Sequence, residues 1–294
     1  MSAIGRTTEP TGERDVLLRA SERALLVPDL LVEARRVANT VIAGWHGRRK
    51  RGPGETFWQF RPWGEGESES RIDWRRSARD DQVYLRDREW EAAHTVWVWA
   101  DPSPSMRFQS VGGTVPKEGR ALVLALSVAE VLARSGERVG YAGLTRPIAA
   151  RNAAERIALG LGRERPELDV AHLRGPAEVV ILSDFLSPLA ETLEVVSALA
   201  QRGIRGHLVE VCDPAEETFP YSGRVEFRDP ETGERLMTGR ADELGAEYRN
   251  AFLARRTELR RVATRAGWSH VVHRTDRPAS EALVALHVRL SGSA

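Results

Sequence analysis

The chain has 294 residues, of which 29% are charged and 41% hydrophobic, and its formal net charge is +1. This length is ample for a substantial core, and the balanced charge gives no reason to expect a nucleic-acid or acidic-membrane partner. A single cysteine excludes an internal disulfide and suits a reducing cytoplasm, and no apolar run approaches the roughly 20 residues that a membrane-spanning helix needs.

The first third of the chain combines a helix with a segment rich in tryptophan and arginine. Residues 1–20 are polar and are expected to form a flexible segment. Leu25–Ala43 is predicted to be a helix, with Pro28 near its first turn. Over residues 52–91, short strand-like runs alternate with turn residues. We therefore predict a unit over 21–93 that consists of this helix and a Trp- and Arg-rich β subdomain.

From residue 94 onward, apolar strands alternate with helices. The first strand, residues 95–100, ends at Asp101. Further strands are expected at 138–144, 178–183, 204–211 and 268–274, and helices at 117–134, 152–161, 188–202, 242–266 and 280–290. A hairpin is expected around the turn residues Asp229-Pro230-Glu231-Thr232-Gly233.

This alternation predicts an α/β domain over residues 94–294. Strands that are apolar on both faces are typical of a mostly parallel, Rossmann-like sheet with helices on both faces. His94–Asp101 is expected among the central strands, because its apolar run leaves neither face for solvent.

The loop that follows the first strand carries the strongest chemical signal. Asp101, Ser103 and Ser105 place one carboxylate and two hydroxyls on a tight loop, and Asp184 follows the third strand of the domain. Ligands of parallel sheets bind outside the carboxyl ends of the strands, and hard cations such as Mg²⁺ prefer oxygen ligands. These four residues are therefore candidate ligands of Mg²⁺ or Mn²⁺. The alternative is that a serine of the loop simply caps the next helix.

Several segments together resemble a known family. They are Arg51-Gly52-Pro53-Gly54-Glu55 with Phe57, then residues 71–79 around Ile72-Asp73-Trp74, then Tyr84–Glu89, the Asp101 loop, Arg138-Val139-Gly140 and the Asp229–Gly233 turn. The chain resembles the domain of unknown function 58 family, a bacterial group with a von Willebrand factor A-like domain, from about Gly44 to Leu290.

The resemblance has implications for the site and for partners. It implies that Asp101, Ser103, Ser105 and Asp184 occupy the positions of a metal-ion-dependent adhesion site. The threonine that completes such a site has no clear counterpart here, since Thr145 is too close to its strand. The resemblance also implies a MoxR-type AAA+ ATPase as a partner protein.

The Asp73-Trp74-Arg75 segment has two interpretations. Trp and Arg are enriched among interface hot spots, which favours a partner-binding surface with Trp74 as the anchor. Alternatively, Asp73 and the arginines around it form an ion-pair network that holds a structural subdomain together.

Taken together, the sequence predicts a cytoplasmic, non-enzymatic protein-binding module. A phosphatase of the haloacid dehalogenase type needs Asp-x-Asp at a strand end, and here Ser103 takes the place of the second aspartate. No phosphate loop and no nucleophile elbow is present. The alternatives are a metal-independent scaffold whose cation loop has decayed and a Mg²⁺-dependent hydrolase that uses Asp101 and Asp184.

Overall fold

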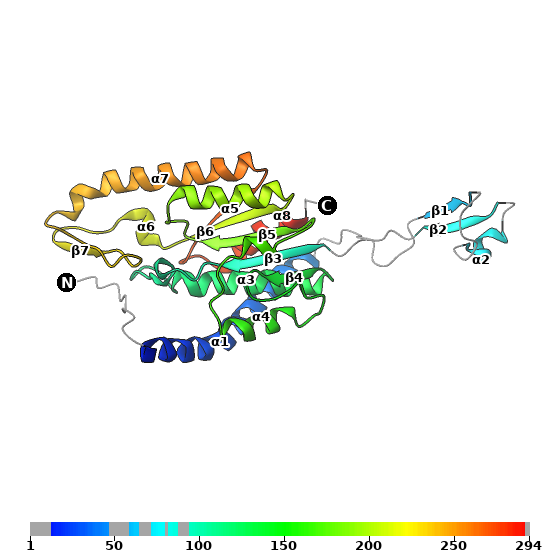
Figure 1. Cartoon of the computed structure of the whole chain (residues 1–294), viewed down its shortest axis with the longest axis horizontal. Coiled ribbons are helices and arrows are strands. Elements are labelled where there is room, and N and C mark those ends of the chain that lie inside the picture. The colour runs from blue at the N-terminus through cyan, green and yellow to red at the C-terminus, as the bar shows by residue number, and fades with distance from the viewer. Residues whose placement is uncertain (1–12, 47–58, 65–71, 80–81, 88–93, 292–294) are drawn as a thin grey trace. The chain divides into compact units, whose positions relative to one another are not determined.

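The computed structural model describes residues 13–46, 59–64, 72–79, 82–87 and 94–291 (Figure 1). The chain divides into two compact units. Residues 1–44 together with 95–294 make the first, here called the sheet unit, and residues 45–94 make the second, here called the inserted unit.

A five-stranded parallel sheet forms the centre of the sheet unit, in the order β4-β3-β5-β6-β9. Its strands are β3 (Thr95–Ala100), β4 (Arg138–Tyr141), β5 (Glu178–Ser183), β6 (Arg205–Cys212) and β9 (Ser269–Arg274). Every residue of β5 is buried, as expected of a strand covered on both faces. The predicted central position of the first strand is confirmed, because β3 pairs with β4 on one side and with β5 on the other.

Helices cover both faces of this sheet (Figure 1). On one side lie α3 (Lys117–Arg134), α4 (Ala153–Leu161) and α1 (Glu13–His46), and on the other lie α5 (Leu189–Gln201) and α7 (Ala241–Arg265). The last helix, α8 (Ala279–Ser291), packs on α3 and β9. Shorter helical segments are η2 (Pro104–Arg107), η3 (Val170–His172) and α6 (Pro214–Thr218), and β7 (Val225–Arg228) and β8 (Arg235–Thr238) form the predicted hairpin.

The N-terminal helix differs from its prediction in extent and in grouping. It begins at Glu13 rather than Leu25, so residues 13–20 are helical and Pro28 lies in the helix interior. It also belongs to the sheet unit, not to the Trp-rich segment. The reason is burial: Ala34 and Ala38 are fully buried, and the Ser127 hydroxyl of α3 donates to the Ala34 carbonyl at 3.2 Å. Residues 1–12 lie outside the described residues.

The inserted unit contains an antiparallel strand pair and a single helical turn. The strands are β1 (Gln59–Pro62) and β2 (Tyr84–Asp87), and the turn is α2 (Trp74–Ser77). The predicted Trp-rich β segment is therefore partly visible, while residues 47–58 lie outside the described ranges. Within the described ranges, no helix combines the length and apolar character that crossing a membrane requires.

Candidate functional site

The carboxyl ends of β3 and β5 form the candidate site. The chain leaves β3 for β4 on one side and returns to β5 on the other, so the strand order reverses between β3 and β5. Such a reversal is where open parallel sheets bind ligands. Asp101 follows β3 and Asp184 follows β5, and the Asp101 backbone N–H donates to the Leu182 carbonyl at 2.8 Å. The two predicted acidic residues therefore lie on neighbouring strands.

Hydrogen bonds within the site hold the Asp101–Ser105 loop. Asp101 Oδ1 accepts from the Ser103 backbone N–H at 2.8 Å, and Asp101 Oδ2 accepts from the Ser183 hydroxyl at 2.6 Å. The hydroxyl oxygens of Ser103 and Ser105 are 3.2 Å apart. Ser103 precedes η2 but makes no side-chain capping bond to it. The serines thus gather beside Asp101, as predicted.

A buried lysine reaches the second predicted acid. Lys117 is the first residue of α3, and its side chain has no solvent exposure. Its ammonium donates to Asp184 Oδ2 at 2.7 Å and also to Glu216 Oε1. Burial alone would lower the pKa of Lys117, but the carboxylates of Glu216 and Asp184 outweigh it and raise that pKa above its ordinary value. The side chain is therefore a fixed positive charge.

Glu216 connects this lysine to the end of β6. Asp213 follows β6 and caps α6, and Glu216 Oε2 accepts from the Asp213 backbone N–H at 2.8 Å in a capping box. Burial raises the pKa of the Glu216 carboxyl above its ordinary value. Asp213 also accepts from the Ser110 backbone N–H at 3.0 Å. Lys117 thereby joins the ends of β5 and β6, and Asp213 joins the end of β6 to the loop that follows β3.

An acidic side chain from the β7–β8 hairpin completes the site. Glu231 Oε1 accepts from the Ser105 backbone N–H at 2.8 Å, across 126 positions of sequence. Two hydrogen bonds within the turn hold the backbone around Glu231. Asp229 Oδ1 accepts from the Glu231 backbone N–H at 2.7 Å, and the Asp229 carbonyl accepts from the Gly233 N–H at 2.9 Å. The sequence marked this segment as a turn and as part of the family resemblance, but it did not predict the contact with Ser105.

Comparison with known proteins places the chain in a family. A family model described as "Protein of unknown function DUF58" matches residues 59–260. The chain belongs to the DUF58 family. The predicted family is thus confirmed. Uncharacterised proteins of Mycobacterium bovis and Mycobacterium tuberculosis are 28% identical to this DUF58 chain over 266 residues, covering 81% of it and 80% of each relative.

Two solved structures are also similar to this DUF58 chain. One is the conserved hypothetical protein BatB from Bacteroides thetaiotaomicron, with a TM-score of 0.40 and 15% identity. The other is an aerotolerance-related membrane protein from Bacteroides fragilis, with a TM-score of 0.42 and 15% identity. Each match covers 68% of this chain and 100% of the other.

The predicted cation ligands do not fit a divalent ion in this arrangement. Mg²⁺ requires near-octahedral oxygen ligands at about 2.0–2.1 Å. Asp184 Oδ2 is bonded to the Lys117 ammonium and Asp184 Oδ1 accepts from the Leu186 N–H at 3.0 Å. Both Asp101 oxygens also accept hydrogen bonds. The Thr145 hydroxyl oxygen accepts from the Tyr141 N–H at 3.0 Å and so holds the turn after β4.

The other predicted site residues lie in the inserted unit of this DUF58 protein. Asp73 Oδ1 accepts from the Arg76 backbone N–H at 3.0 Å and so caps α2. This cap accounts for an aspartate directly before a helical turn. The ion-pair network around Asp73 stays a prediction, because Arg71 lies outside the described residues. Trp74 is 64% exposed, and Arg75 beside it is also exposed. The sequence did not reveal α2, since four residues show no periodicity.

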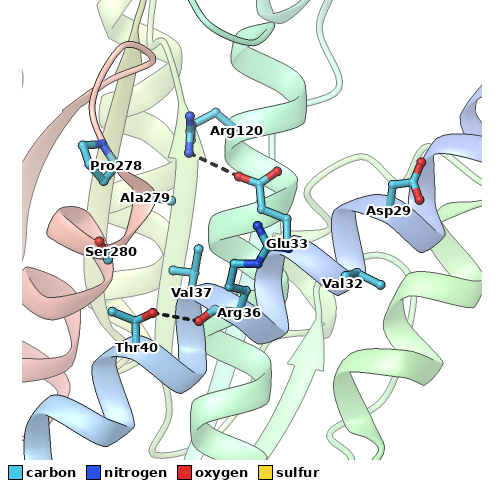
Figure 2. A pocket seen from close by; sticks show the side chains of 10 residues that line it. All are labelled: Asp29, Val32, Glu33, Arg36, Val37, Thr40, Arg120, Pro278, Ala279 and Ser280. Atoms are coloured by element: carbon cyan, nitrogen blue, oxygen red, sulfur yellow. Dashed lines mark hydrogen bonds and ion pairs between the residues drawn. The ribbon is translucent and has the colours of Figure 1, made fainter.

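A separate pocket of about 490 Å³ lies in the sheet unit, lined by α1, Arg120 of α3 and the start of α8 (Figure 2). Its charged lining side chains are of both signs: Asp29 and Glu33 are acidic, and Arg36 and Arg120 are basic. Arg120 and Glu33 form an ion pair at 3.5 Å. The lining thus carries no net formal charge and gives no preference for an anion or a cation.

Proposed function

We propose that this DUF58 chain is a protein-binding module of the von Willebrand factor A-like type, without a catalytic role. In this proposal, the carboxyl edge of β3 and β5 holds an acidic side chain of a partner. The observation that carries the proposal is the Glu231 carboxylate on the Ser105 backbone N–H, at 2.8 Å. An N–H that already accommodates one carboxylate at a strand-order reversal is suited to accommodate another.

The hairpin that supplies Glu231 is placed to act as an internal occupant. Its strand β8 is largely exposed, with Leu236 59% and Met237 61% accessible. Near its turn, β7 is anchored by stacked and edge-on aromatic contacts of Phe227 with Phe219 and Tyr221. Because Glu231 lies beyond these contacts in the exposed turn, it can leave Ser105 without unfolding the sheet unit. A partner carboxylate would then take its place.

The non-enzymatic part of the proposal rests on the acidic residues of the site. Asp184 is engaged by Lys117, and Asp101 is engaged by Ser103 and Ser183. A general base must be within hydrogen-bond reach of the substrate proton. Because each carboxylate already has a structural task in holding the loop or the lysine, we favour a binding role over hydrolysis.

The partner that the resemblance implies is a MoxR-type AAA+ ATPase, so the test uses the purified ATPase from the same genome. We expect Asp101→Ala to weaken binding at least about tenfold, because the loop loses the acceptor of the Ser103 N–H and the Ser183 hydroxyl. We expect Glu231→Gln to strengthen partner binding, because an uncharged side chain at position 231 competes less well for the Ser105 backbone N–H. Biolayer interferometry with each variant measures both effects.

Glu234→Gln is the matched control, since it changes the same charge in the same exposed turn. Binding that is unchanged by both Asp101→Ala and Glu231→Gln would contradict the proposal. A second candidate is a scaffold that binds through the inserted unit, which the 64% exposure of Trp74 favours. That candidate predicts loss of binding with Trp74→Ala or Arg75→Ala and no response to the Asp101 and Glu231 variants.

A further inference from the structure

The first residue of α3 is an unusual place for a lysine. The N-terminal turn of a helix carries partial positive charge and favours acidic side chains. Lys117 nevertheless stands there without solvent exposure, preceded by Pro116 and with its ammonium 5.8 Å from the centre of the Phe108 ring. A buried ammonium at a helix N-terminus is stable only where neighbouring charge compensates it. The compensating groups are Asp184 and Glu216.

These two carboxylates come from the ends of neighbouring strands. Asp184 follows β5 directly, and Glu216 lies in α6 just after β6. Lys117 therefore joins α3 to both strand ends, which is the linking role that a bound cation has in other proteins. The two acids would repel each other without it. Their positions are explained by the ammonium, with no further ion required.

A second cation at the same place would meet this charge at short range. A divalent ion held by Asp184 would lie within a few ångströms of the ammonium, which is bonded to that carboxylate at 2.7 Å. Like charges repel strongly at such distances in a buried setting. In the Asp101 half of the site, each carboxylate oxygen accepts one hydrogen bond, from Ser103 or from Ser183. The acidic side chains of both halves are thus held in place without a metal.

We propose that the Lys117 ammonium is the resident cation of this edge, and that it occupies the charge position that a divalent ion would otherwise take. This inference concerns the site's own ions and holds whether or not the edge binds a partner. Wild-type protein is then indifferent to Mg²⁺ and Mn²⁺. Replacement of Lys117 by an uncharged residue leaves Asp184 and Glu216 uncompensated beside Asp101, and creates a site for a divalent cation.

The experiment compares wild type, Lys117→Met and Lys117→Met/Asp184→Asn, with Mn²⁺ as the probe. Electron paramagnetic resonance of free Mn²⁺ measures binding, and melting curves with and without Mg²⁺, at matched ionic strength, measure stabilisation. We expect no saturable binding by the wild type at millimolar Mn²⁺. Lys117→Met should gain one saturable site at least about tenfold tighter than any wild-type binding, and a melting temperature that rises with Mg²⁺. Asp184→Asn in the same chain should abolish the gain.

Saturable Mn²⁺ binding by the wild type, as tight as that of Lys117→Met, would overturn the inference. Only the wild type and Lys117→Met need to fold for this comparison. A folded Lys117→Met that binds no Mn²⁺ would overturn it equally. If Lys117→Met does not fold, Lys117→Gln replaces it, because it removes the charge but keeps a hydrogen-bond donor for the two carboxylates, and the same two outcomes decide. None of these readouts involves a partner, so they are independent of the protein-binding proposal.

Discussion

Buried titratable side chains in the sheet unit are largely matched by neighbours of opposite charge. Glu210 accepts from Arg256 Nε at 2.8 Å and lies 3.0 Å from His270 Nε2. Glu178 Oε1 lies 3.0 Å from Arg205 Nη2. His273 differs, because it is 3% exposed and its Nε2 makes no hydrogen bond within the described part of the chain. Burial first, and the charge of Arg120 second, lower the pKa of His273 to about 4.

This low pKa makes stability depend on pH in a defined window. The folded-state pKa lies below the ordinary value of 6.5, so protonation favours the unfolded chain. The contribution of His273 is fully present above pH 6.5 and is lost as pH falls toward about 4, by up to about 3 kcal/mol. Urea unfolding at a series of pH values, for wild type and His273→Gln, measures it.

The variant should show a shallower loss of stability across that window. His287, whose pKa is also lowered by burial, leaves a residual slope in both proteins. Identical pH profiles for wild type and His273→Gln would show that His273 titrates normally in the folded state.

At the scale of elements, the packing of β6 against the residue that precedes β9 requires a glycine in β6. A Cβ at Gly206 would lie 2.1 Å from the Trp268 ring, which is 5% exposed. Gly206→Ala should therefore destabilise the fold by about 1–3 kcal/mol, since neither the strand nor the buried ring has room to move. Gly119→Ala in α3 is the matched control, because nothing lies within 4 Å of its Cβ position.

Gly119→Ala should instead stabilise the protein by about 0.5–1 kcal/mol, as expected for alanine in place of glycine within a helix. Chemical denaturation of the two variants checks both signs. Destabilisation of equal size in the two would mean that the loss of a glycine, rather than the contact with Trp268, is responsible.

Elements were predictable where an apolar run met a clear boundary. β3, β5 and α3 begin and end at the predicted residues, because their apolar patterns stop at Asp101, at Asp184 and at the Ser135-Gly136 pair. The turns α2 and α6 were missed, since each is set by one aspartate cap rather than by periodicity. The burial of α3 almost all round depends on tertiary packing, because α1, α4 and α8 pack on it.

The site was predictable only in the part that is local in sequence. Asp101, Ser103 and Ser105 share one loop, and Asp184 follows a strand of recognisable type. Lys117 and Glu231 reach the site from a helix start and a hairpin turn, and such pairings depend on tertiary packing. One signal did exist for Lys117: a basic residue in the first helical turn opposes the helix dipole.

At the scale of the whole molecule, the described core residues all belong to the sheet unit. The buried core cluster consists of described residues between Val27 and Val41 and between Val96 and Leu286. Replacement of residues 47–93 by a flexible Gly/Ser linker should therefore leave the sheet unit folded, with a change in unfolding free energy within about 1 kcal/mol.

Circular dichroism and urea unfolding of the full chain and of the linker variant provide the measurement. Loss of cooperative unfolding, or a far larger loss of stability, would show that the sheet unit requires residues 47–93. A folded linker variant would also lack Trp74, so it could be used to test whether partner binding requires that residue.

The insertion also sets a delay during synthesis of the protein. α1 buries Ala34 and Ala38, and the Ser127 hydroxyl that bonds the Ala34 carbonyl comes 93 residues later in the chain. At about 5–20 residues per second, α1 emerges from the ribosome roughly 5–20 seconds before α3 exists to cover it. During that interval its apolar stripe is open to chaperones and to other nascent chains. The order of elements along the gene thus leaves the first helix without its packing partner for that interval.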